Sequence, residues 1–166
     1  LLRRGARRVV CVDVGYGQLA WSLRTDPRVL VLDRTNVRDL DPSAVGDPVD
    51  VVVADLSFIS LRLVLPALAA AAREDADLVL MVKPQFEVGR DALAAGGVVR
   101  DSAQRAGAVA DVTRAAYDGQ ALGVAGVVAS PLPGPAGNVE YFLWLRRDAP
   151  TLDPDHLASA VAEGPQ

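Results

Sequence analysis

The sequence predicts an α/β fold built on a mostly parallel sheet. Along its 166 residues, short apolar runs typical of buried strands alternate with stretches of helical composition. Three of these runs end in a charged side chain, at Asp13, Asp55 and Lys83. The carboxyl ends of parallel strands meet at the edge where open α/β sheets bind ligands, so we expect these three side chains at that edge.

Cap residues and hydrophobic patterns place the remaining elements. Gly5 is expected to end a short N-terminal helix, and Ser60 and Ser102 are expected to cap longer helices. The predicted strands span residues 8–13, 28–33, 50–55, 77–83, 124–130 and 138–145, and the predicted helical stretches span 18–25, 42–48, 61–73, 102–118 and 155–163. Residues 89–101 read as a long loop. The last strand follows a Gly/Pro-rich connector, which allows antiparallel pairing.

Composition narrows the class of protein. The length fits one globular domain, and no apolar run is long enough to cross a bilayer. No signal segment opens the chain, so a cytoplasmic location is expected by default. A single cysteine excludes disulfides and cysteine-based metal sites. The net charge of −4 argues against an extensive nucleic-acid surface and leaves only local arginine clusters near the two ends.

Lys83 is the first candidate catalytic residue. It is the only lysine among 17 basic residues, so its place at a strand end suggests a role that an arginine cannot fill. A lysine can give up its proton where burial disfavours the charged form, whereas a guanidinium cannot. Asp55 could hold the ammonium by an ion pair, and Glu140 is the third candidate. The ordinary alternatives are a strand-end lysine in a surface salt bridge and a solvent-facing glutamate.

A second group of residues suggests a nucleoside site. Asp13 ends the first predicted strand, and a carboxylate there can accept hydrogen bonds from both hydroxyls of a ribose. Asn36, with Val37, could contact an adenine edge. Asp and Asn are also common turn and cap residues, which remains the alternative for both positions.

Five sequence segments together resemble the TlyA family of ribosomal RNA 2'-O-methyltransferases, which have an FtsJ-like catalytic domain and are sometimes labelled haemolysins. The segments are VDVGYGQLAW at 12–21, RTNVR at 34–38, VADLSFIS at 53–60, VKPQFE at 82–87, and SPLPGP at 130–135 followed by GNVEYFLW at 137–144. The resemblance covers about residues 1–147, the expected FtsJ-like domain, and leaves 148–166 as a C-terminal tail.

The resemblance implies an activity and the residues that carry it. It implies S-adenosylmethionine-dependent methylation of ribose in ribosomal RNA, with ribosomal RNA or ribosomal subunits as partners and without a metal. Asp55, Lys83 and Glu140 match three members of the family's lysine-aspartate-lysine-glutamate tetrad. Lys83 is then the base that activates the ribose 2'-hydroxyl.

The resemblance also implies a set of cofactor contacts. Asp13 matches the acid that binds the cofactor ribose, and Gly15 and Tyr16 line the pocket. Asn36 and Val37 lie near the adenine, and Asp55 belongs to both the cofactor and the catalytic groups.

Three features of the family have no counterpart in this sequence: an N-terminal RNA-binding domain, the first tetrad lysine, and the first central strand with its Gly-rich loop. The chain starts at Leu1 without a methionine, and we expect it to be a piece of something longer. Without the central strand, the strands at 8–13 and 50–55 would keep open edges, and unpaired backbone groups are costly. We therefore expect weak stability or altered pairing, and weak or absent cofactor binding.

The sequence leaves two other functions to compare with this one. The chain could be an inactive methyltransferase-like module that docks on ribosomal RNA or assembles with a partner. A cytolysin is disfavoured, because the sequence has neither a membrane-spanning run nor a basic amphipathic helix.

Overall fold

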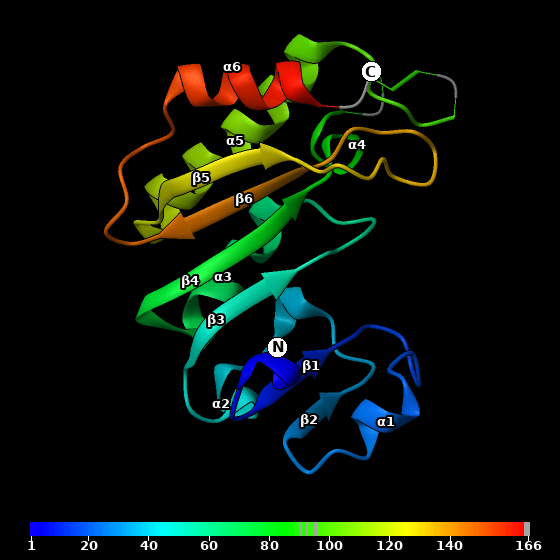
Figure 1. The fold of residues 1–166 in the computed structure, drawn as a ribbon, viewed down its shortest axis with the longest axis vertical. Coiled ribbons are helices and arrows are strands. Elements are labelled where there is room, and N and C mark those ends of the chain that lie inside the picture. Colours follow the sequence, from blue (N-terminus) through cyan, green and yellow to red (C-terminus); the bar gives the residue numbers. More distant parts are fainter. Residues whose placement is uncertain (90, 92, 95, 165–166) are drawn as a thin grey trace. The chain divides into compact units, whose positions relative to one another are not determined.

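The computed structural model describes residues 1–89, 91, 93–94 and 96–164. The chain is α/β, as predicted, and divides into two compact units, Leu1–Pro48 and Val49–Gln166. Figure 1 shows the strands and helices that make up these units. Each unit is described by itself below.

The first unit is a small parallel strand pair with short helical turns. Its elements are η1 (Leu2–Arg4), β1 (Val9–Val12), α1 (Trp21–Arg24), β2 (Val29–Leu32), η2 (Val37–Asp39) and α2 (Pro42–Val45). β1 and β2 pair in parallel, with Val9 opposite Val29 and Val12 opposite Leu32. Gly5 ends η1 with φ of 95°, the left-handed conformation expected of a C-cap glycine. The predicted helix at 18–25 is reduced to the single turn of α1.

The second unit is a mixed four-stranded sheet with helices. Its elements are β3 (Val49–Ala54), α3 (Leu61–Ala71), β4 (Ala72–Val82), α4 (Pro84–Glu87), α5 (Ser102–Gln120), β5 (Gly123–Ala129), β6 (Tyr141–Arg146) and α6 (Pro154–Glu163). The strand order is β3-β4-β6-β5. β3 and β4 are parallel, whereas β6 is antiparallel to both of its neighbours. The predicted antiparallel pairing of the last strand is therefore confirmed.

The core of this unit lies on the face of the sheet that α3 and α5 cover. Alternate residues of β4 and β6 point to that face because side chains alternate along a strand. The fully buried strand residues include Leu78, Leu80, Val82, Tyr141, Leu143 and Leu145. On α3 the buried positions Leu61, Val64, Leu65 and Leu68 recur at helical spacing. The sheet therefore holds the strand ends on a packed, rigid base.

Two strands keep an open edge within the described part of the chain. β1 pairs only with β2, and β3 pairs only with β4. On β3, Val51 is 44% exposed and Val53 is 57% exposed. The open edges expected for these two strands are thus present.

Two local predictions were wrong, and one short element was missed. Asp101, rather than Ser102, caps α5, because its carboxylate accepts the Ala103 N–H at 2.8 Å. The helix after Ser60 ends at Ala71 instead of residue 73, and β4 begins at once. Finally, the turn of helix α4 directly after Lys83 was not predicted. Ser60 does cap α3, as expected.

Candidate active site

Lys83 and Asp55 form an ion pair just beyond the carboxyl ends of β4 and β3. Lys83 Nζ lies 2.6 Å from Asp55 Oδ1 and donates to Ser57 Oγ at 3.3 Å. The two strands are parallel neighbours, with Ala54 opposite Leu80. The Lys83 side chain is only 12% exposed, whereas that of Asp55 is 66% exposed. The structure thus brings together the pair expected from the sequence, with the lysine as its mostly buried member.

Glu140 lies on the neighbouring strand, directly before β6. The β4–β6 ladder ends at the pair Val82 and Tyr141, so Lys83 and Glu140 are the next residues on these two strands. Glu140 is 6% exposed, so the solvent-facing alternative is wrong. Within the described residues its side chain makes no ion pair with Lys83. Its Oε1 instead accepts a hydrogen bond from Gln85 Nε2 at 2.9 Å.

The Gly/Pro-rich connector before β6 leaves room for the Glu140 carboxylate. A Cβ atom at Gly134 would lie 2.7 Å from Glu140 Oε1, which is too close. The backbone N–H of Ser130 donates to the Glu140 carbonyl at 2.7 Å and ties the two ends of the connector together. A side chain at position 134 would therefore displace the Glu140 carboxylate from its present position.

Gln85 is a site residue that the sequence reasoning missed. Its Nε2 holds Glu140, but its Oε1 is buried and has no hydrogen-bond partner among the described residues. An orphaned buried acceptor is unusual in a native protein and suits a donor from a bound molecule or water. The signal in the sequence was its position two residues after Lys83, which only the unpredicted turn of α4 makes meaningful.

In the first unit, the loops after β1 and β2 lie side by side. Asp13 Oδ1 accepts the Gly15 N–H at 2.7 Å. The Asp13 carbonyl accepts from Thr35 N at 2.9 Å, and the Gly15 carbonyl accepts from Arg34 N at 2.8 Å. Asp13 and Gly15 thus lie at the same edge as the residues that follow β2, as expected for a parallel pair.

The rest of the expected cofactor group is partly engaged in local contacts. The exposed Tyr16 ring faces Arg24 and Arg34, whose guanidinium carbons are 5.3 and 4.7 Å from its centroid. A hydrogen bond to Asp33 at 2.6 Å raises the pKa of Arg24. Asn36 Oδ1 accepts the Arg38 N–H at 3.1 Å and caps η2.

These residues still fit a nucleoside. Asp13 is exposed, and no described group donates to its Oδ2, which leaves a carboxylate oxygen for ribose hydroxyls. The Asn36 amide nitrogen is likewise left for a base edge, and Val37 beside it is half-buried. The turn and cap roles of Asp13 and Asn36 therefore coexist with a possible binding role.

Other features of the described residues do not add to this site. No group of three or more His, Cys, Asp or Glu side chains that could hold a metal ion occurs in the described ranges. No described helix is long and apolar enough to cross a membrane. A mostly apolar groove of about 410 Å³ lies between α5 and α6, lined by residues such as Tyr117 and Leu157, and contains none of the predicted site residues.

Comparison with known proteins decides the family. The model of the FtsJ-like methyltransferase family matches residues 1–147. The chain belongs to the FtsJ-like methyltransferase family. The expected α/β methyltransferase fold is thereby confirmed, and the matched residues contain every predicted site residue of both units.

Individual FtsJ-like relatives agree with this assignment. The chain is 60% identical over 173 residues to the 16S/23S rRNA (cytidine-2'-O)-methyltransferase TlyA of Mycobacterium tuberculosis, across 99% of this chain and 63% of that protein. It is 42% identical to the rRNA methyltransferase homologue YqxC of Bacillus subtilis, across 87% of this chain and 51% of that protein. A structure described as a hemolysin from Streptococcus thermophilus superposes with a TM-score of 0.91 and 38% identity, across 98% of this chain and 59% of that one. The chain thus spans less than two thirds of the length of these relatives.

Proposed function

We propose that this chain is the catalytic part of an S-adenosylmethionine-dependent methyltransferase that modifies ribose 2'-hydroxyls of ribosomal RNA in the cytoplasm. The observation that carries the proposal is the Lys83–Asp55 ion pair of 2.6 Å, with the lysine mostly buried at a strand end. The family match and the 60% identity to an rRNA 2'-O-methyltransferase support the same reaction.

Each candidate site residue of the second unit has a role in this proposal. The amine form of Lys83 takes the proton of the ribose 2'-hydroxyl. The hydroxyl oxygen at the same time forms the new bond to the methyl carbon. Asp55 and Ser57 fix the position of Nζ. Glu140, held by Gln85, presents a buried carboxylate next to Lys83 along the strand ends and helps to orient the hydroxyl. Such a displacement depends mainly on positioning and on removal of the proton.

The first unit supplies the cofactor contacts in this proposal. When bound, the cofactor would supply the methyl group, and its sulfonium sulfur would become a neutral thioether. Asp13 accepts hydrogen bonds from the cofactor ribose, Gly15 and Tyr16 line the pocket, and Asn36 and Val37 contact the adenine. Asp55 keeps the cofactor role that the family resemblance implies. The open Oδ2 of Asp13 and the free amide nitrogen of Asn36 support these roles.

The arginine clusters differ in their suitability for RNA phosphates. Arg146 is already bound by Asp77 and Asp148, and Arg147 donates to the Gln120 carbonyl at 2.6 Å. The exposed N-terminal arginines at positions 3, 4 and 7 make no side-chain hydrogen bond or ion pair within the described residues. The N-terminal cluster is therefore the better candidate for phosphate contact.

Substitution of Lys83 tests the catalytic role. In the complete protein, Lys83→Ala should lower methyl transfer to ribosomal subunits by about 10²- to 10⁴-fold, the usual contribution of a general base. Cofactor affinity should change little. Arg114→Ala, which removes an exposed cation of α5, is the matched control. Retained transfer by Lys83→Ala would exclude Lys83 as the base.

A second function remains, namely an inactive methyltransferase-like module that docks on RNA or a partner. The single-partner strands β1 and β3 favour it, because each has an open edge. Calorimetric titration of S-adenosylmethionine into this chain, beside a version that also carries the family's Gly-rich loop, separates the two, because binding by neither version would favour the inactive module. Binding by both versions supports an enzyme whose pocket is sufficient here. Binding only by the longer version means that the activity needs more than these 166 residues.

A further inference from the structure

The two segments that carry the proposed catalytic pair are joined at both ends. The first runs from Asp55 to Ser60, between β3 and α3, and the second is Lys83 with the turn of α4. At one end, Lys83 contacts Asp55 and Ser57. At the other end, Glu87 contacts the start of α3.

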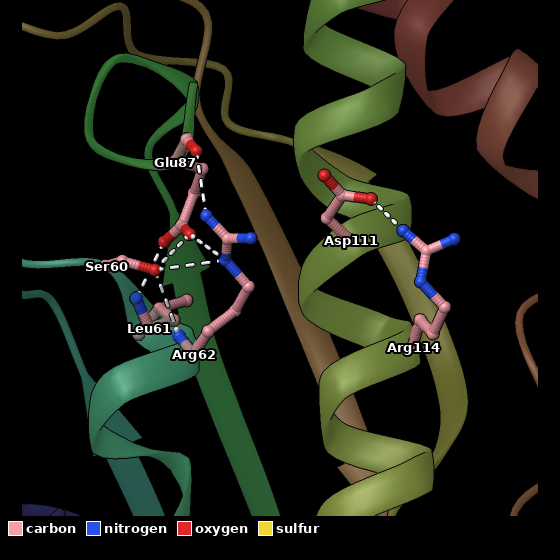
Figure 2. A network of polar contacts seen from close by, with 6 residues as sticks. All are labelled: Ser60, Leu61, Arg62, Glu87, Asp111 and Arg114. Atoms are coloured by element: carbon pink, nitrogen blue, oxygen red, sulfur yellow. Dashed lines mark hydrogen bonds and ion pairs between the residues drawn. The ribbon is translucent and has the colours of Figure 1, made fainter. Parts of the chain in front are cut away.

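Glu87 makes that second connection with a buried carboxylate. Its side chain is 1% exposed. Oε2 accepts from Ser60 Oγ at 2.6 Å, and Oε1 accepts from Leu61 N at 2.7 Å. Arg62 completes the network, with its Nε 3.4 Å from Glu87 Oε2 and its Nη2 donating to the Glu87 carbonyl at 3.0 Å. Figure 2 shows these contacts converging on Glu87.

Capping alone does not explain a buried acid at this position. Ser60 already accepts the Arg62 N–H at 3.3 Å, as an N-cap residue does. The negative charge is favourable at the start of a helix, but a neighbouring surface acid could supply it without burial. What the buried Glu87 adds is a link between α3 and the segment that begins at Lys83.

The turn of α4 can transmit this link to the lysine. Lys83 is the N-cap residue of α4, and Glu87 is its last residue. The Phe86 N–H donates to the Lys83 carbonyl at 2.8 Å, and the Val88 N–H donates to the Pro84 carbonyl at 3.0 Å. Pro84 further fixes the backbone at the first helical position. The turn therefore ties the backbone position of Lys83 to that of Glu87.

The facing segment is also held in a conformation that it would not adopt freely. Phe58, between Asp55 and Ser60, has φ of 63°, which is unfavourable for an aromatic residue. Its ring lies 5.2 Å from that of Phe86 on α4, although the side chain is 91% exposed. Surroundings that fix both ends of the segment explain how this backbone persists.

We propose that Glu87 is a positioning residue, whose contacts with Ser60 and Leu61 fix α4 against the start of α3 and so keep Lys83 Nζ on Asp55. The catalytic consequence rests on the proposed function. The effect of Glu87 on the position of Lys83 does not depend on that function, and it can be tested without measuring methyl transfer.

The test uses the fact that Lys83 is the only lysine. In the full chain labelled with [ε-¹³C]lysine, NMR gives one lysine methylene signal, which reports on the ion pair. Glu87→Ala should move this signal toward that of free lysine. The two methylene protons should then share one chemical shift, because a freely rotating side chain averages their surroundings. Asp111→Ala is the control, because it removes a carboxylate from the exposed Asp111–Arg114 pair that Figure 2 shows on α5. It should leave the signal unchanged.

A double-mutant cycle then asks whether Glu87 acts through Asp55. Asp55→Asn should shift the lysine signal in the parent chain and add little in Glu87→Ala. An unchanged signal in a folded Glu87→Ala chain, or two shifts that simply add, would overturn the proposal. If Glu87→Ala does not fold, Glu87→Gln and Ser60→Ala decide. Intermediate shifts in both support positioning, and a parental signal in both refutes it.

This readout separates the two proposals. If Lys83→Ala keeps methyl transfer while Glu87→Ala still releases the lysine signal, the catalytic role fails and the positioning role stands. If Lys83→Ala loses methyl transfer while the lysine signal is unchanged in Glu87→Ala, the catalytic role stands and the positioning role fails.

Discussion

Tyr141 offers a sharp test of the packing beneath the site. It is the first residue of β6, next to Glu140, and its side chain is fully buried. Its hydroxyl has no hydrogen-bond partner among the described residues. A buried hydroxyl without a partner costs about 1–3 kcal/mol, whereas a phenyl ring of the same shape avoids that cost. Tyr141→Phe should therefore stabilise the protein by about 1 kcal/mol, or raise its Tm by about 2–4 °C.

The pH dependence sharpens this prediction. Burial raises the pKa of Tyr141, so the folded state holds the phenolic proton more tightly than the unfolded state. The parent chain should lose stability as the pH rises above about 10, the usual tyrosine pKa, and Tyr141→Phe should lack this part of the loss. The advantage of the variant should thus widen between pH 7 and pH 11.

Urea unfolding followed by circular dichroism at both pH values measures the effect. Arg105 contributes a positive charge near Tyr141, and its buried Nε also has no hydrogen-bond partner in the described part of the chain. A water molecule shared by the two groups would make the hydroxyl useful. Destabilisation of Tyr141→Phe by more than about 0.5 kcal/mol would therefore refute the reasoning, since it exceeds the usual effect of a neutral change.

Three further predictions concern the packing and charges of the two units. Leu80→Ala should destabilise the chain by about 2–5 kcal/mol in urea unfolding, because Leu80 is fully buried in β4, whereas Leu63→Ala at a half-exposed position should cost far less. Burial raises the pKa of Cys11, so at neutral pH its thiol should react with iodoacetamide more slowly than free cysteine, and an equal rate would contradict the β1 packing. Hydrogen bonds from the Arg28 side chain and, to a lesser extent, its backbone N–H lower the pKa of Asp26 to about 2, so NMR should show Asp26 titrating there and moving part of the way up toward 4 in Arg28→Ala, which keeps the backbone bond. Since this pKa is depressed on folding, the contribution of Asp26 to stability is present above about pH 4 and is lost as the pH falls toward 2.

Local rules succeeded where a residue acts mainly on its own neighbours along the chain. Ser60 caps α3 and Gly5 ends η1, because both effects depend on nearby backbone groups. The same rules misplaced the start of α5 by one residue, since Asp101 and Ser102 are both good caps and the carboxylate took the role. The end of α3 was also wrong, because pairing of Ala72 with Val49 of β3 begins the strand β4 in a stretch without strand propensity.

Some features of the candidate site could likewise be predicted from local sequence, and others could not. Lys83 and Asp55 could be paired from the sequence, because parallel strand ends converge and the lysine is unique. The burial of Glu140 could not be predicted, since it depends on the path of the connector past Gly134 and on Gln85 from a helix that the sequence pattern did not indicate.

The sequence by itself determined the α/β order of elements, the family resemblance and the polar residues at the strand ends. Those features follow from hydrophobic period and from residue chemistry, which are local properties of the chain. Only the tertiary structure decided that Gln85 and Glu87 on one short turn hold Glu140 and the start of α3. Their partners lie 55 and 26 or 27 positions away in the sequence, and no local pattern records which distant groups a buried polar side chain will meet.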